Sequence, residues 1–225
     1  METIDTIEYK GYTINIHPDD HPLNPREDWE PLGTMICWHR RYNLGDENPF
    51  DSSDEFFEFI KDNPGIVVLP LYLYDHSGIS MSTGSFVGRA HHAEWDSGQV
   101  GFIYATREDM QKWFGWKYIT KARREAVEKY LDGEVESYDQ YLRGEVYGYT
   151  IEDPTGDELD ESCWGFFGDP HGYMFDDCKN IIDYDIQSRI NEEKKNRQSH
   201  WNKLKGYIQN KVPFQYRQKY TPIYS

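Results

Sequence analysis

Two apolar runs, both rich in β-branched and aromatic residues, most constrain what this chain can fold into. Residues 66–74 read IVVLPLYLY, and residues 98–105 read GQVGFIYA. Short runs of this composition, bounded by turn-forming residues, are typical of strands buried in a sheet. We therefore expect residues 66–74 to form a central strand and residues 98–105 to form another strand.

Further strands are expected where polar and apolar residues alternate. Residues 4–16 alternate around Gly11 and predict a hairpin, and the four prolines that follow predict a loop. The other expected strands lie at residues 32–39, 145–152 and 162–169. Strands and helices are interspersed without a regular βαβ order. The pattern therefore predicts an α+β fold with a mostly antiparallel sheet, several flanking helices and a C-terminal helix.

Capping residues mark where the helices should begin and end. The first helix, within residues 51–65, is expected to have Ser53 or Asp51 as its N-cap. The second is expected to begin at Thr106, with Asp109 making an imperfect capping box. The third is expected to begin at Thr120. Gly133 is expected to end the third helix, and residues 135–142 are expected to form a helix or a turn. A last helix is expected from Met174 to about Ile208, before Pro213 stops it.

Charge is distributed unevenly and suggests two domains. Residues 1–185 hold 38 acidic and 15 basic side chains, a net charge of −23, whereas residues 186–225 hold 2 acidic and 9 basic, a net charge of +7. We expect an acidic α+β domain over residues 1–185, with a basic helical extension over residues 186–225 packed on or beside it. An acidic body repels nucleic acid and favours basic partners, including proteins that themselves bind nucleic acid. The plainer alternative is that the charge serves solubility.

The sequence lacks the features that are typical of secreted and membrane proteins, and these missing features predict the compartment. Cys37, Cys163 and Cys178 are odd in number and form no CxxC pair, which argues against a disulfide framework or a zinc knuckle. The first residues lack the basic and apolar regions of a signal peptide. The longest apolar run is far shorter than the ~20 residues of a membrane-spanning helix. We expect a cytoplasmic protein with no membrane partner and no cofactor.

The segment between the two apolar runs is dense in small and reactive residues, and a loop presented by two strands is a common place for binding. The binding candidates are Asp75, His76, Ser77, Gly78, Ser82, Thr83, Trp95, Asp96, Ser97 and Gln99. Asp75, His76 and Asp96 are also the candidates for acid–base catalysis. His76, His91 and His92 are weaker metal-ligand candidates, because adjacent histidines point to opposite faces of an extended segment.

The same segment also has a purely structural interpretation. Asp75 and Asp96 can close turns at the strand ends, and Trp95 can be a core anchor. Asp75, His76 and Ser77 are sequence neighbours, which rarely adopt the geometry of a catalytic triad. The segment has no GxSxG elbow, and its glycines lack the lysine of a P-loop. No motif identifies a reaction, so the sequence leans away from an enzyme.

The paired motifs DHSG at residues 75–78 and WDSGQVG at residues 95–101 resemble those of an uncharacterised protein family from bacteriophages and other bacterial mobile elements. The resemblance continues through YLDGEVESYDQYLRGEVYGYTIE and SCWGFFGD, and so covers roughly residues 64–180. Between the motifs, members of the family are expected to have a shorter link with a cysteine, whereas this chain reads FVGRAHHAE. The resemblance implies a protein made by a phage or mobile element inside a bacterial cell, with no established activity.

Together these observations favour a protein that binds and inhibits a host protein, such as a nucleic-acid-binding defence system targeted by anti-CRISPR or anti-restriction proteins. Residues 145–185 hold 12 carboxylates and one lysine, so imitation of DNA by the acidic surface is a specific form of this function. One alternative is a metal-dependent enzyme acting on a nucleotide or phosphorylated small molecule, through Asp75, His76 and Asp96. Another is a small-ligand-binding protein whose glycine- and serine-rich loop holds an anion.

Overall fold

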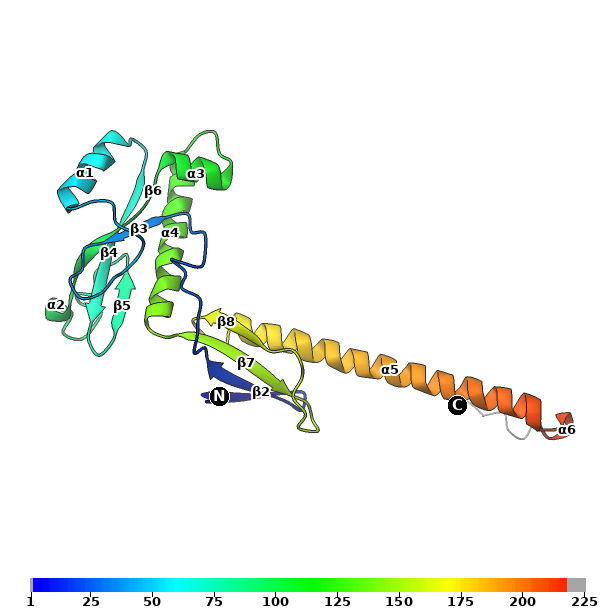
Figure 1. Ribbon diagram of the computed structural model, residues 1–225. Coiled ribbons are helices and arrows are strands. Elements are labelled where there is room, and N and C mark those ends of the chain that lie inside the picture. Colours follow the sequence, from blue (N-terminus) through cyan, green and yellow to red (C-terminus); the bar gives the residue numbers. More distant parts are fainter. Residues whose placement is uncertain (1, 218–225) are drawn as a thin grey trace. The chain divides into compact units, whose positions relative to one another are not determined.

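The computed structural model describes residues 2–217 and has the α+β fold that the sequence predicts (Figure 1). The chain divides into two compact units, Met1–Gly172 and Tyr173–Ser225, which are described separately below. The domain boundary expected after residue 185 falls inside one helix, α5 (Tyr173–Lys211). Residues 218–225 of the predicted basic extension lie outside the described residues.

The first unit contains two four-stranded antiparallel sheets. Sheet A has the order β1-β2-β7-β8, formed by β1 (Asp5–Tyr9), β2 (Tyr12–Pro18), β7 (Val146–Glu152) and β8 (Cys163–Phe167). Sheet B has the order β3-β6-β4-β5, formed by β3 (Thr34–Cys37), β6 (Ser97–Ala105), β4 (Val67–Asp75) and β5 (Ile79–Ser82). The two apolar runs are the inner strands β4 and β6 of sheet B, as expected.

Sheet B lies between two helices, α1 (Ser53–Asp62) and α4 (Lys121–Leu142) (Figure 1). Successive side chains of a strand point to opposite faces of the sheet. Accordingly, Ile103 of β6 packs in one cluster with Leu131 of α4, and the next residue, Tyr104, packs in another with Phe56 of α1. Two shorter helices, α2 (Ala93–Asp96) and α3 (Arg107–Phe114), precede and follow β6 in the chain. Both faces of sheet B are therefore covered by a helix, which explains the apolar run of β4 and the apolar second half of β6.

The predicted helix caps are confirmed at two positions and wrong at one. Thr106 and Asp109 form a complete capping box, and Thr120 accepts a hydrogen bond from the backbone N–H of Arg123. The cap of α1 is Ser52, whose side chain accepts a hydrogen bond from the backbone N–H of Glu55, and not Ser53 or Asp51. Adjacent hydroxyl and carboxylate residues can all serve as caps, so the register of the first turn was ambiguous from sequence.

Gly133 does not end α4, contrary to the prediction. The helix continues to Leu142 because buried side chains on both sides of the glycine, spaced three or four residues apart, contribute to one core: Val127, Leu131, Val135 and Tyr138. Each buried apolar side chain contributes about 1.5–3 kcal/mol, more than the ~1 kcal/mol that glycine costs relative to alanine inside a helix. Tertiary packing thus overrides the local stop signal.

Two strand glycines permit close contacts that a side chain would prevent. A Cβ atom at Gly101 of β6 would lie 1.9 Å from the carbonyl oxygen of Ile36 in β3. A Cβ atom at Gly148 of β7 would lie 2.2 Å from the ring of Trp164 in β8. Glycine at these positions lets β3 approach β6 and lets the Trp164 ring pack against β7.

The described part of the second unit consists of the 39-residue helix α5 and the short helix α6 (Phe214–Arg217). Pro213 lies between them, as predicted. Ion pairs one turn apart line the polar middle of α5, with Arg189 2.7 Å from Asp185 and Arg197 3.0 Å from Glu193. Within residues 2–217, no helix combines the length and the apolar character needed to cross a bilayer.

Candidate functional site

The end of β4 brings His76 beside Asp96. Tyr74 of β4 pairs with Ser97 of β6, so the residues just outside these strand ends meet. The Nδ1 atom of His76 lies 2.8 Å from Oδ2 of Asp96. An aspartate at one ring nitrogen fixes the orientation of the imidazole and leaves the other nitrogen, Nε2, for a ligand or a proton. Two of the three acid–base candidates therefore form a pair.

Asp75, the third candidate, does not join them. Its carboxylate forms an ion pair with Arg41 and accepts a hydrogen bond of 3.4 Å from the hydroxyl of Tyr42. Adjacent residues of an extended strand point to opposite sides, which explains why Asp75 and His76 have different partners. Asp75 holds the 41–42 loop against the end of β4.

The histidines at positions 91 and 92 lie near His76 but form no metal site. His92 has a left-handed backbone with φ of +56°, so the segment is not extended and the two adjacent rings lie 3.8 Å apart, contrary to the expected opposite orientation. The ring of His76 is 6.2 Å from each of them. Among residues 2–217, no three His, Cys, Asp or Glu side chains are placed to hold a metal ion.

Several other predicted binding residues have structural partners of their own. Ser77, with φ of +61°, and Gly78 form the β4–β5 turn, where the backbone N–H of His76 donates to the carbonyl of Gly78 at 3.0 Å. The hydroxyl of Thr83 donates to the carboxylate of Asp132. The Ser82 hydroxyl accepts a hydrogen bond of 3.1 Å from the backbone of its own loop. These residues shape the hairpin and its contact with α4.

The remaining predicted residues, at the start of β6, do not converge on His76 either. Ser97 donates to the carbonyl of Ala93 at 2.6 Å, and the Gln99 amide donates to the carbonyl of Gly101 at 3.4 Å. Trp95 is 87% exposed, so its interpretation as a core anchor is wrong. The four-residue helix α2 holds Trp95 outside the core although its neighbour Ala93 is fully buried.

His76 lines a cavity of about 530 Å³ beside the β4–β5 hairpin and the end of α4. This volume is within the ~300–1,000 Å³ usual for small-ligand sites. The rings of Tyr74 and Phe86 stack with their centres 5.5 Å apart and form part of the wall. The polar side chains that line the cavity are those of His76, Ser80, Arg89 and Arg143, together with the Tyr74 hydroxyl.

This cavity is locally basic in an acidic unit. Residues 1–172 hold 34 acidic and 14 basic side chains, a net charge of −20, yet none of the ten described residues that line the cavity is acidic. Arg143 is paired with Asp139 and Glu145. Arg89 donates to two carbonyls of its own loop, at 2.6 and 2.8 Å, and has no ion pair with a carboxylate within residues 2–217. Its guanidinium can therefore donate to an anion, although it also lines an adjoining hollow that contains Asp132, Glu136 and Asp139.

Sequence reasoning missed Arg89 as a site residue, although one signal could have identified it. Arg89 is the only Lys or Arg between residues 62 and 106. A lone arginine inside the candidate segment has no nearby basic residue with which to share an anion. Its position in the chain therefore already favoured it as the anion contact.

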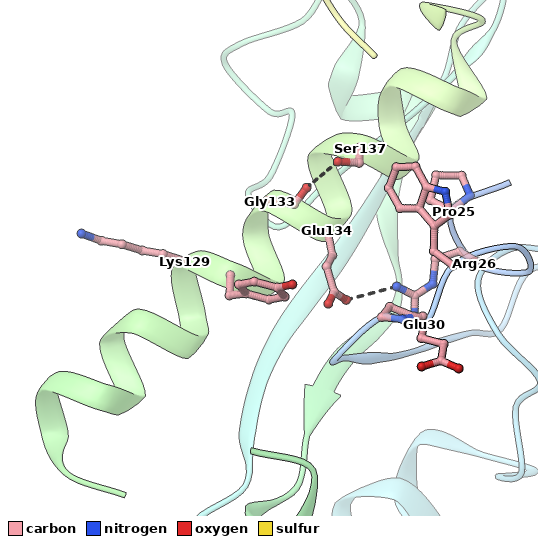
Figure 2. Close-up of a pocket in the computed structure, with 10 residues that line it drawn as sticks. Pro25, Arg26, Glu30, Lys129, Gly133, Glu134 and Ser137 are labelled. Carbon is pink, nitrogen blue, oxygen red and sulfur yellow. Dashed lines mark hydrogen bonds and ion pairs between the residues drawn. The ribbon is translucent and has the colours of Figure 1, made fainter. Parts of the chain in front are cut away.

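A second cavity, of about 370 Å³, lies between the 25–31 loop and α4 (Figure 2). At its floor is Arg26, whose side chain is almost completely buried. The Arg26 guanidinium donates to Asp46 at 2.9 and 2.5 Å, to Glu134 at 3.2 Å and to the carbonyl of Gly33 at 2.6 Å. One guanidinium thus ties the N-terminal loop and α4 together.

Glu134 also receives hydrogen bonds from the backbone of the 32–33 segment. Its carboxylate accepts the backbone N–H of Leu32 at 2.7 Å and that of Gly33 at 3.1 Å. Burial raises the pKa of Glu134, although these hydrogen bonds and the charge of Arg26 oppose the shift. This group could not be predicted from sequence, because Arg26 and Glu134 are 108 positions apart.

The thiols of the first unit should differ sharply in reactivity. Burial, reinforced by the charge of Asp46, raises the pKa of Cys37 to about 12, whereas Cys163 is exposed. The thiolate is the reactive form, so we expect iodoacetamide at pH 8 to modify Cys163 in the native protein and to spare Cys37 until urea unfolds it. Peptide mapping by mass spectrometry measures both. Equal rates at the two sites in the native protein would contradict this burial.

Comparisons with known proteins find no matching family model, no similar curated protein and no similar solved structure. The origin in a phage or mobile element therefore stays a prediction from the paired motifs.

Proposed function

We propose that the protein binds a small phosphorylated molecule in the cavity beside His76. The observation that carries the proposal is the charge of the lining: it includes Arg89 and no carboxylate, in a unit with a net charge of −20. The field of so many carboxylates repels anions. A pocket whose lining has no carboxylate and includes a guanidinium without an ion pair among the described residues is therefore suited to an anionic ligand.

The other lining groups indicate the size and chemistry of that ligand. The Arg89 guanidinium can donate to phosphate oxygens beside the His76 ring, and the Tyr74 and Phe86 rings offer an apolar wall for a planar group. A volume of about 530 Å³ suits a nucleoside monophosphate. Ser80 is the only serine that lines the cavity, and a nucleophilic serine would need a base beside it. Its hydroxyl donates to Asp139 at 2.7 Å and not to His76. The geometry thus supports binding ahead of nucleophilic catalysis.

Isothermal titration calorimetry with adenosine 5′-monophosphate and with inorganic phosphate tests this proposal. A hydrogen bond to a charged group contributes about 1.5–3 kcal/mol, so Arg89→Ala should weaken binding of the nucleotide by roughly tenfold or more. Arg107→Ala is the matched control, because Arg107 is an exposed arginine of α3 that does not line the cavity. The proposal fails if neither probe binds, or if the two arginine variants weaken binding equally.

A second candidate function, binding to a basic host protein, is favoured by the exposed carboxylates of the first unit. The outer face of α1 exposes Asp54, Glu55 and Glu58, and the β7–β8 loop exposes Asp157, Glu158, Asp160 and Glu161. In a mobile-element setting such a partner would be a nucleic-acid-binding defence protein, and the carboxylates would stand in for DNA phosphates. Salt-sensitive binding of arginine-containing peptides to the purified protein tests this candidate.

A further inference from the structure

One face of the long helix α5 (Figure 1) carries apolar side chains along much of its length. The residues of this face are three or four positions apart, which places them on one side of a helix with 3.6 residues per turn: Ile186, Ile190, Glu193, Arg197, Trp201, Leu204 and Ile208. All side chains from residue 187 to residue 200 are exposed, and Ile190 and Leu204 are 41% and 36% exposed. A helix gains most of its stability from packing an apolar face against another element. This face is therefore suited to contact with a second helix.

The aliphatic residues of this face are placed symmetrically about Arg197. Ile190 lies seven residues before Arg197, and Leu204 lies seven residues after it. Ile186 and Ile208 lie eleven residues before and eleven residues after it. If a second copy of α5 runs in the opposite direction with the two Arg197 residues side by side, Ile190 of each copy faces Leu204 of the other. Ile186 then faces Ile208, so an antiparallel pair places apolar residues opposite apolar residues at both ends of the contact.

The charge along α5 favours the antiparallel direction over the parallel one. Residues 173–185 hold four aspartates and one lysine, a net charge of −3, whereas residues 194–211 hold six basic residues and no acidic one, a net charge of +6. In a parallel pair each end would face its own charge and be repelled. In an antiparallel pair the acidic end of each copy faces the basic end of the other. Asp183 and Lys211, each three positions beyond an end of the apolar face, lie fourteen residues before and after Arg197 and so come opposite each other.

We propose that α5 pairs with α5 of a second copy of this chain, in the opposite direction. The overlap spans residues 183–211, a length of about 43 Å at a rise of 1.5 Å per residue. At its centre, Arg197 of each copy has its own Glu193 3.0 Å away, so the two guanidinium groups are compensated where they meet. A second copy is favoured over an unrelated partner because reversing the helix matches both its apolar positions and its charge. The inference is independent of the ligand proposed for the His76 cavity.

Sedimentation equilibrium of the full chain over the micromolar concentration range tests the association, and we expect a monomer–dimer equilibrium. Ile190→Asp places a carboxylate against apolar side chains of the other copy, twice in each dimer, and should raise the dimer Kd by at least about tenfold. Ser188→Asp is the matched control: it adds the same charge on the opposite side of the helix and should change the Kd by less than about twofold. Circular dichroism checks that both variants keep their helix content. A wild-type chain that stays monomeric, or equal effects of the two variants, would overturn the proposal.

Charge reversals test the direction of pairing. Asp183→Lys alone, or Lys211→Asp alone, puts like charges opposite each other at both ends of an antiparallel pair and should raise the Kd by about fivefold at low salt. The combined variant restores opposite charges and should return the Kd to within about twofold of the wild-type value. In a parallel pair each of these residues would face its own equivalent, so like charges would meet in every variant. Equal dimer Kd values for all four proteins would therefore overturn the antiparallel arrangement.

Discussion

Arg26→Ala is expected to lower the free energy of unfolding of the first unit by about 3–5 kcal/mol, the usual cost of removing one partner of a buried ion pair. The Arg26 side chain is only 1% exposed, and its loss leaves the carboxylates of Asp46 and Glu134 facing each other without a cation. It also removes the donor to the Gly33 carbonyl. Urea unfolding followed by tryptophan fluorescence measures the change.

The control is Arg41→Ala, which breaks the ion pair with Asp75. The Arg41 side chain is 68% exposed, so solvent screens this pair and we expect a loss of about 0–1 kcal/mol. Comparable losses for the two variants would show that the Arg26 group is solvated and does not join the loop to α4. Arg26→Lys should fall between wild type and Arg26→Ala, because an ammonium keeps the charge but lacks the planar guanidinium geometry that pairs with both carboxylate oxygens of Asp46.

Phe56→Ala should have a similarly large effect, about 3–5 kcal/mol, since it deletes a fully buried aromatic ring. The Phe56 ring lies 5.1 Å from Phe102 and 5.3 Å from Tyr104, and so attaches α1 to sheet B. Differential scanning calorimetry or urea unfolding measures the loss. Limited proteolysis should at the same time cut within residues 53–62, because α1 loses its main buried contact.

Phe57→Ala is the matched control for the same helix. Phe57 is 45% exposed, so its removal takes little apolar surface out of the core. We expect a loss under about 1 kcal/mol, in line with most surface substitutions. If Phe57→Ala destabilised the protein as much as Phe56→Ala, the assignment of the buried face of α1 would be wrong.

Much of the fold was predictable because its signals are local. The alternation around Gly11 located the β1–β2 hairpin, and Thr106 located the start of α3. Strand β5 was missed because ISMS is short and only half apolar, and its strand character comes from pairing with β4. The continuation of α4 through Gly133 was missed for a related reason, since packing against sheet B decides it.

The contacts among the candidate site residues could be predicted from the sequence only in part. The density of polar residues between β4 and β6 predicts a site at the β4–β5 hairpin, yet the pairing of His76 with Asp96 depends on the register of these strands. Asp75 looked equivalent to His76 in sequence and has a different partner because of strand alternation. No local sequence pattern predicts the ion-pair group of Arg26, Asp46 and Glu134, because its members are 20 and 108 positions apart in sequence.

Sheet A has a consequence for how the chain is made. Strands β1 and β2 come from the start of the first unit, and strands β7 and β8 come from its end. The side chain of Asn15 in β2 donates to Glu152 in β7 at 2.9 Å, across 137 positions of sequence. Sheet B, by contrast, is complete within residues 34–105. At a synthesis rate of about 5–20 residues per second, the free edge of β2 waits on the order of ten seconds for its partner while sheet B already assembles. An unpaired strand edge can pair with strands of other chains. We therefore expect the protein to be most prone to aggregation during synthesis, while the β1–β2 hairpin waits for β7.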